Sequence, residues 1–168
     1  MMIIDGKKEA EILRLEIKKE IESLKSKNNE VPGLTVILIG DFAPSQIYVK
    51  NKEKSAKEVG IHSNVVRYSK EVTEEEVLKK IEDLNNDTDV SGILVQLPLP
   101  PQINKEKIIN AVSPKKDVDG FHPMNVGNLS SGYRCLVPCT PLGCLYLIKK
   151  VEKNLSGKNA VIIGRSNL

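Results

Sequence analysis

The sequence predicts an α/β fold in which helices cover both faces of a mostly parallel sheet. Segments with the character of strands and of helices alternate along the chain, as they do in such folds. The segment 92–97 is apolar apart from Gln96 near its end, which is typical of a parallel strand buried on both faces. Hydrophobic residues make up 40% of the 168 residues and charged residues 28%, so the chain has the composition and length of a globular domain with its own core.

The predicted helices share an apolar stripe or clear end signals, and they cover 7–26, 45–59, 73–84, 105–111 and 140–151. The predicted strands are 34–39, 64–68, 92–97 and 160–163. Pro44 suits the first turn of the second helix and Gly60 the cap after it. Thr73 and Glu76 form the capping-box pattern that opens the third helix.

Two stretches fall outside this alternation. Residues 113–134 are polar, show little periodicity and are expected to form a long functional loop. Residues 160–163 have the character of a buried strand, which normally leads into a helix, but the sequence stops five residues later. This ending predicts a truncated chain.

Charge and composition exclude several classes of protein. Lys and Arg number 25 against 22 Asp and Glu, with the signs interspersed, so no nucleic-acid partner is indicated. The apolar runs are too short for a membrane span or a signal peptide, and we expect a cytoplasmic protein. Cys135, Cys139 and Cys144 lack paired spacing and are expected to be free thiols. A nucleophilic cysteine would need His62 or His122 as its base and is the less favoured alternative.

Tyr48 and Lys52 are four residues apart on a predicted helix, so their side chains share a face, with Ser45 one turn earlier. This helix follows a predicted parallel strand, and ligands bind at that edge of such sheets. The spacing alone more often reflects a packed tyrosine and a solvated lysine. It also occurs in short-chain dehydrogenases, but residues 1–40 contain no glycine-rich dinucleotide loop.

Two further polar positions are candidates for a site. Gln96 ends an apolar strand, where its amide needs a hydrogen-bond partner, either backbone or the Lys52 amine. Asp117, Asp119 and His122 stand close together in the long loop. They suit a solvated turn as well as a metal site, and no further cluster completes a coordination shell, so no metal is expected.

Five segments, in order along the chain, together resemble one family: YVKNK at 48–52, GILVQLPLP at 92–100, KDVDG at 116–120, PCTP at 138–141 and GRS at 164–166. This is the family of bifunctional methylenetetrahydrofolate dehydrogenase/cyclohydrolases of the FolD type. The resemblance implies a homodimeric parent enzyme of one-carbon folate metabolism that serves purine biosynthesis. Such an enzyme oxidises 5,10-methylenetetrahydrofolate with NADP and hydrolyses the 5,10-methenyl product to 10-formyltetrahydrofolate.

The resemblance also implies the role of each site residue. Lys52 would be the acid/base group and Gln96 its hydrogen-bonding partner. Tyr48 would pack against the folate, Asp119 would anchor the pterin, and Ser45 would border the same pocket. The resemblance also implies that the NADP cofactor would contact Gly164, Arg165 and Ser166.

The resemblance divides the chain into a folate-binding catalytic domain, 1–138, and a linking helix with the first strand of an incomplete Rossmann-like NADP-binding domain, 139–168. This chain alone is therefore expected to lack dehydrogenase activity. Two alternatives remain, a folate-binding module without turnover and a lyase that uses Lys52 to form a Schiff base with a carbonyl.

Overall fold

The structure is a computed structural model that describes residues 3–164, and its centre is a sheet of three parallel strands in the order β2-β1-β3. The strands are β1 (Gly33–Ile39), β2 (His62–Tyr68) and β3 (Gly92–Val95). Val36 in the middle of β1 is paired with Val65 on one side and Leu94 on the other. All three strands therefore end at the same edge of the sheet.

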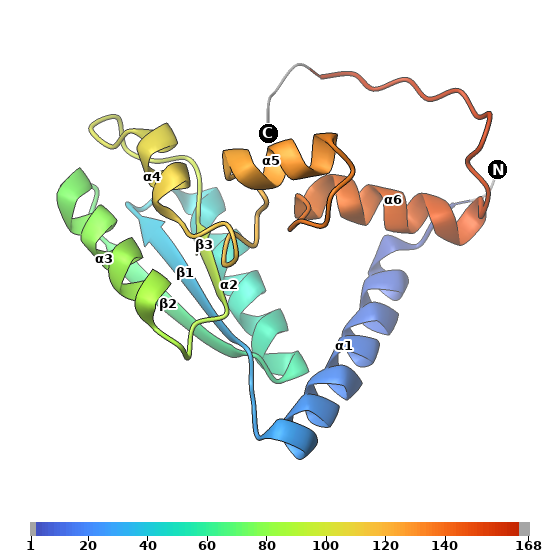
Figure 1. The fold of residues 1–168 in the computed structure, drawn as a ribbon, viewed down its shortest axis with the longest axis horizontal. Coiled ribbons are helices and arrows are strands. Elements are labelled where there is room, and N and C mark those ends of the chain that lie inside the picture. Colours follow the sequence, from blue (N-terminus) through green and yellow to red (C-terminus); the bar gives the residue numbers. More distant parts are fainter. Residues whose placement is uncertain (1–2, 165–168) are drawn as a thin grey trace.

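The described helices are α1 (Gly6–Asn28), α2 (Ala43–Val59), α3 (Glu74–Asn86), α4 (Lys105–Ala111), α5 (Pro123–Ser130) and α6 (Cys139–Val151). Alternate residues of β1 face opposite sides of the sheet. Val36 and Leu38 pack with Val49 of α2, whereas Ile37 and Ile39 belong to a second cluster with α3 and α4. The sheet is therefore the middle of three layers (Figure 1), which confirms the predicted α/β fold.

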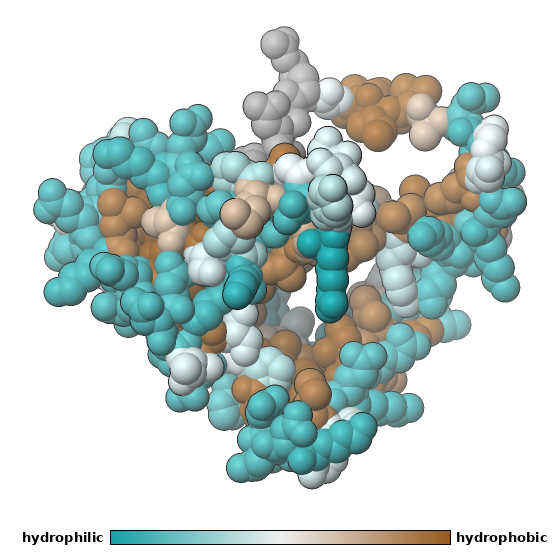
Figure 2. Space-filling model, viewed as in Figure 1, coloured by the Kyte–Doolittle hydropathy of each residue, from teal (hydrophilic) through white to brown (hydrophobic). Residues whose placement is uncertain are grey.

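Two helices lie beside this three-layer unit (Figure 1). α1 packs against the C-terminal end of α2, where Ile21 of α1 is buried against the cap residue Gly60. α6 meets the start of α1 through an ion pair of 3.2 Å between Lys150 Nζ and Glu9 Oε2. None of the residues of α6 is buried. Its apolar side chains lie on the surface, and those of the extended chain that follows are exposed across a gap from it (Figure 2).

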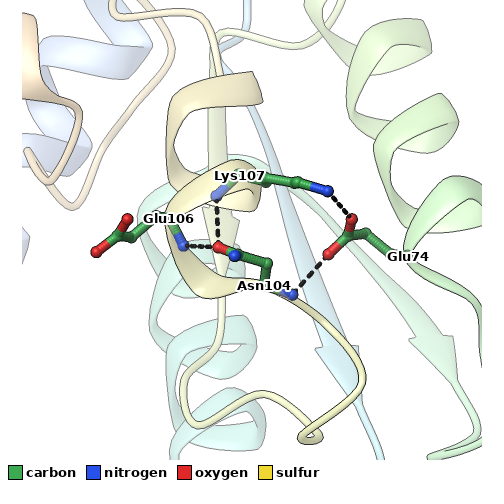
Figure 3. A network of polar contacts seen from close by, with 4 residues as sticks. All are labelled: Glu74, Asn104, Glu106 and Lys107. Carbon is green, nitrogen blue, oxygen red and sulfur yellow. Dashed lines mark hydrogen bonds and ion pairs between the residues drawn. The ribbon is translucent and has the colours of Figure 1, made fainter.

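Side-chain caps fix the helices on the outer layer. Thr73 and Glu76 form the predicted capping box at the start of α3. Asn104 Oδ1 accepts hydrogen bonds from the backbone N–H groups of Glu106 and Lys107 at the start of α4 (Figure 3). Glu74 of α3 accepts from Asn104 N at 2.6 Å and from Lys107 Nζ at 2.8 Å, so the two helices are held together at their first turns.

The structure corrects the prediction of a long loop at 113–134, because this stretch contains α5. His122 caps α5 by accepting a hydrogen bond from Met124 N at 3.1 Å, and Pro123 occupies the first turn. A proline after a residue with an acceptor side chain is a helix-start signal, although the few apolar residues here show no clear stripe. The predicted loop was therefore wrong over eight residues.

Residues 160–163 were predicted to form a strand, and the structure shows extended chain without strand pairing there. A strand needs a neighbour for its backbone hydrogen bonds, and no described strand lies alongside. Val161, Ile162 and Ile163 are 90%, 90% and 98% exposed. None of the helices described has the length and hydropathy required to cross a bilayer.

Candidate active site

The predicted pair on α2 lies at the edge of the sheet where the strands end. The chain leaves β1 through Gly40, whose φ of 79° suits glycine, and Pro44 stands in the first turn of α2. Val49 is completely buried against the sheet, whereas Tyr48 is 61% exposed and Lys52 half-buried. The helix thus presents an open aromatic face and, one turn later, a partly covered amine.

Lys52 meets Gln96 across the edge of the sheet. Lys52 Nζ donates a hydrogen bond to Gln96 Oε1 at 3.2 Å, which joins residues 44 positions apart. β3 ends at Val95, shorter than predicted, but Gln96 N still donates to Ile37 O at 2.9 Å and continues the pairing. The predicted contact between this amide and the lysine is therefore present.

Ser45 and Gln96 converge on one backbone carbonyl. Gln96 Nε2 donates to Leu97 O at 2.8 Å, and Ser45 Oγ donates to the same oxygen at 3.4 Å. Ser45 is 3% exposed, so its hydroxyl ties the first turn of α2 to the chain after β3. These bonds hold the Gln96 amide with its oxygen toward Lys52. A direct contact of Ser45 with a ligand stays a prediction.

Asp119 brings a carboxylate into the electrostatic range of Lys52. Burial raises the pKa of Asp119, the positive charge of Lys52 opposes that rise, and the negative charge of Asp117 adds to it. Cys139, at the start of α6, lies in the same field, where partial desolvation of its thiol and then the Asp119 charge raise the pKa of that thiol. The sequence predicted a free thiol at Cys139, with a nucleophilic role as the less favoured alternative, and the position of Cys139 beside the site comes from the tertiary structure.

Asp117 and Asn125 were not recognised as parts of one unit. Asp117 Oδ2 accepts hydrogen bonds from His122 N at 2.8 Å and from Asn125 Nδ2 at 2.9 Å. Both side chains are buried, which rules out the solvated turn considered for this segment. Among residues 3–164, no group of three or more His, Cys, Asp or Glu side chains is arranged to hold a metal ion.

The shape of the surface separates two kinds of space near these residues. A cavity of about 20 Å³ lies between Asp119, Phe121 and Ile93, with room for little more than one water molecule. A groove of about 840 Å³ runs between α1 and α2 and includes Asn51, next to Lys52. Its charged lining is basic in balance and consists of Lys7, Arg14, Lys18, Lys54, Glu11 and Glu58. The groove, unlike the cavity, has room for part of a larger anionic ligand, and its lining does not include Tyr48, Lys52, Gln96 or Asp119.

The described residues do not make a dinucleotide site. Such a site needs a glycine-rich turn from a strand into a helix, whose N-terminal N–H groups hold the diphosphate. Gly164 follows exposed, unpaired chain, and a Cβ added to it would meet no atom within 4 Å. Arg165 and Ser166 lie outside the described residues.

Comparisons with known proteins agree with this arrangement. The model of the tetrahydrofolate dehydrogenase/cyclohydrolase catalytic domain matches residues 4–119. Bifunctional protein FolD of Pelagibacter ubique is 65% identical over 100% of this chain and 60% of its own length. The corresponding protein of Wolbachia pipientis from Culex pipiens is 54% identical over 99% of this chain and 57% of its own length.

Solved structures show the same fold. The crystal structure of the bifunctional FolD enzyme from Campylobacter jejuni has a TM-score of 0.96 and 48% identity, covering 99% of this chain and 59% of that one. The Trypanosoma brucei enzyme, complexed with NADP cofactor and inhibitor, has a TM-score of 0.86 and 33% identity, covering 89% of this chain and 51% of that one. The chain thus spans about 60% of the length of the curated relatives that it matches. Because the family model covers more than half of its residues, the chain belongs to the tetrahydrofolate dehydrogenase/cyclohydrolase family.

Proposed function

We propose that this chain supplies the folate side of an enzyme of one-carbon metabolism. The enzyme oxidises 5,10-methylenetetrahydrofolate to 5,10-methenyltetrahydrofolate with NADP and hydrolyses that product to 10-formyltetrahydrofolate. The observation that carries this proposal is the hydrogen bond of 3.2 Å from Lys52 Nζ to Gln96 Oε1, at the edge of a parallel sheet and in the field of Asp119. Family membership supports the same assignment.

Hydrolysis of the methenyl group is the step that these residues can serve. Water adds to the cationic carbon between the two nitrogens of the folate and loses a proton. The bond from that carbon to the ring nitrogen then breaks, and this nitrogen gains a proton. The hydroxyl group on the carbon loses its proton to solvent as the formyl C=O forms, and the formyl group stays on the other nitrogen. In the proposal the Lys52 amine takes the first proton and supplies the second, which is general acid/base catalysis by one group.

The neighbours of Lys52 have distinct roles in this proposal. Gln96 is neutral, so its oxygen orients the lysine without adding a fixed negative charge beside it. Asp119 accepts hydrogen bonds from the amino-pyrimidine edge of the pterin, where an ionised acceptor strengthens each bond. Tyr48 stacks its exposed ring on the folate. The basic groove between α1 and α2 suits the carboxylates at the far end of a folate.

NADP is proposed as the cofactor of the full-length enzyme, and its hydride-accepting nicotinamide supplies the oxidation. We assign 1–138 to a folate-binding catalytic domain and 139–168 to the start of the NADP-binding domain. The exposure of the apolar side chains of α6 and 161–163 supports this division, since such surface is usually covered in a complete protein. We also propose a cytoplasmic homodimer that serves purine biosynthesis, on the strength of the family.

Replacement of Lys52 by Met tests the proposal. Met keeps the length of the side chain but carries no proton, so we expect the hydrolysis of 5,10-methenyltetrahydrofolate to fall by about 10² to 10⁴. Binding of a folate analogue should stay within about tenfold, or about 1.4 kcal/mol. Lys50→Met is the matched control, because Lys50 lies on the same helix but is exposed, and its activity should equal that of the wild type.

The outcomes separate the competing functions. Hydrolysis retained by Lys52→Met would refute the proposed role of the lysine. A wild-type chain that binds folate but does not hydrolyse the methenyl compound would be a binding module. Trapping of a carbonyl substrate on Lys52 by borohydride would instead identify a Schiff-base lyase.

A further inference from the structure

We propose that Asp117 and Asn125 are positioning residues, which hold the turn that carries Asp119 so that its carboxylate meets the pterin. The inference rests on the proposed function, because it assigns Asp119 the role of substrate anchor. It concerns a buried pair whose side-chain hydrogen bonds go to His122 N, to Pro114 O and between its two members, rather than to Lys52 or Gln96. The pair acts through the backbone on either side of Asp119.

The first argument is the hydrogen bonding of the pair. Asp117 and Asn125 are 6% and 4% exposed, so each of their bonds is shielded from water. A single oxygen, Asp117 Oδ2, accepts from His122 N at 2.8 Å and from Asn125 Nδ2 at 2.9 Å. Asn125 Nδ2 also donates to Pro114 O at 2.9 Å. The start of the turn is thereby tied to its end and to α5.

The second argument is that Asp119 lies between two fixed points. Asp117 forms a parallel bridge with Ile93, and the N–H group of Ile93 donates to Lys116 O at 2.7 Å. Gly120 N donates to Asp117 O at 3.1 Å, and its φ of 68° turns the chain back. A Cβ at Gly120 would lie 2.8 Å from Leu136 O, so this backbone packs closely against the segment before α6.

The third argument is that no side-chain hydrogen bond holds the Asp119 carboxylate. Among the described residues 3–164 this carboxylate, which lines the small cavity beside Phe121, accepts no hydrogen bond from another group. The position of the carboxylate therefore depends on the backbone that Asp117 fixes. Misplacement of a binding group by about 1 Å lowers catalytic efficiency by as much as about 10².

Three variants test the inference in the full chain. Asp117→Ala removes the acceptor of both hydrogen bonds, whereas Asp117→Asn can place its amide oxygen where Oδ2 stands and keep both. We expect Asp117→Ala to raise KM for 5,10-methenyltetrahydrofolate by at least about tenfold with kcat within about threefold. Asp117→Asn and the control Asp83→Ala, at an exposed position of α3, should keep KM within about threefold of the wild type.

Hydrogen exchange at the His122 amide measures, without any substrate, how firmly Asp117 Oδ2 fixes the backbone of this turn. Its rate should rise by at least about tenfold in Asp117→Ala and return toward the wild-type rate in Asp117→Asn, because protection follows the local opening equilibrium. Where Asp117→Ala does not fold, Asn125→Ala removes the bonds of Asn125 to Asp117 Oδ2 and to Pro114 O but keeps the bond from His122 N, and it should raise KM in the same direction.

Two results would overturn the inference. One is a wild-type KM in Asp117→Ala, and the other is an equal rise of KM in Asp117→Ala and Asp117→Asn, which would assign the effect to charge rather than to geometry. Failure of the proposed function looks different. In that case the wild-type chain itself neither binds nor hydrolyses the folate, Asp119 loses its role as anchor, and the exchange at His122 reports a purely structural turn.

Discussion

Replacement of Gln96 by Leu isolates the contribution of the amide that orients Lys52. Leu has a similar volume but removes the acceptor of the bond from Lys52 Nζ, at 3.2 Å, and the donor to Leu97 O, at 2.8 Å. A hydrogen bond to a charged group contributes about 1.5–3 kcal/mol. If this orientation is needed only in the transition state, kcat for hydrolysis should fall by about 10-fold to 150-fold.

Ser45→Ala is the matched control for this substitution. It also removes a donor to Leu97 O, from Ser45 Oγ at 3.4 Å, but it leaves the bond between Lys52 and Gln96 intact. We expect its kcat to stay within about threefold of the wild type, with a loss of stability of about 0.5–1.5 kcal/mol in denaturant unfolding. The assay is the steady-state hydrolysis of 5,10-methenyltetrahydrofolate, with kcat and KM determined separately.

The reasoning would be refuted if Gln96→Leu kept a wild-type kcat, since the amide would then have no part in the reaction. It would also be refuted if both variants lost kcat equally. In that case the common factor would be the Leu97 carbonyl, and the effect would belong to the backbone after β3 rather than to Lys52.

Two further variants test the turn around Asp119. Burial raises the pKa of Asp119 above its unfolded value, so the folded chain binds this proton more tightly, and stability falls as the pH rises from the unfolded pKa through the folded one. Asp119→Asn should therefore be more stable than the wild type at neutral pH, equal to it at a pH below both values, and weaker in folate binding; equal unfolding curves at neutral pH would contradict this. Gly120→Ala combines a φ of 68° with a Cβ 2.8 Å from Leu136 O and Pro138 N, whereas Gly132→Ala has a φ of 76° and no atom within 4 Å. Both should lose about 1–3 kcal/mol in thermal or denaturant unfolding through backbone strain, with the larger loss in Gly120→Ala, and equal losses would show that the close contact relaxes freely.

Local sequence signals were sufficient to predict the helix ends that are fixed by residues within the same segment. Pro44 and Gly60 delimit α2, and the capping box of Thr73 and Glu76 starts α3, because these residues satisfy backbone groups within a few positions of themselves. α5 was not predicted because a short helix with few apolar residues shows a weak stripe, and its only local signals are the cap at His122 and the proline that follows it. The strand expected at 160–163 needed a partner strand, which local sequence does not specify.

The sequence by itself determined the α/β alternation, the common face of Tyr48 and Lys52, and the family resemblance, since all three depend on residue types and their spacing along the chain. Only the tertiary structure decided which distant groups meet. Lys52 reaches Gln96 across 44 positions because β1 and β3 are paired in parallel and end at one edge of the sheet. The turn carrying Asp119 reaches the same edge because Asp117 continues the pairing beside Ile93 and is held there by Asn125. Such contacts depend on strand order and register, which are set by packing over the whole domain rather than by any single segment.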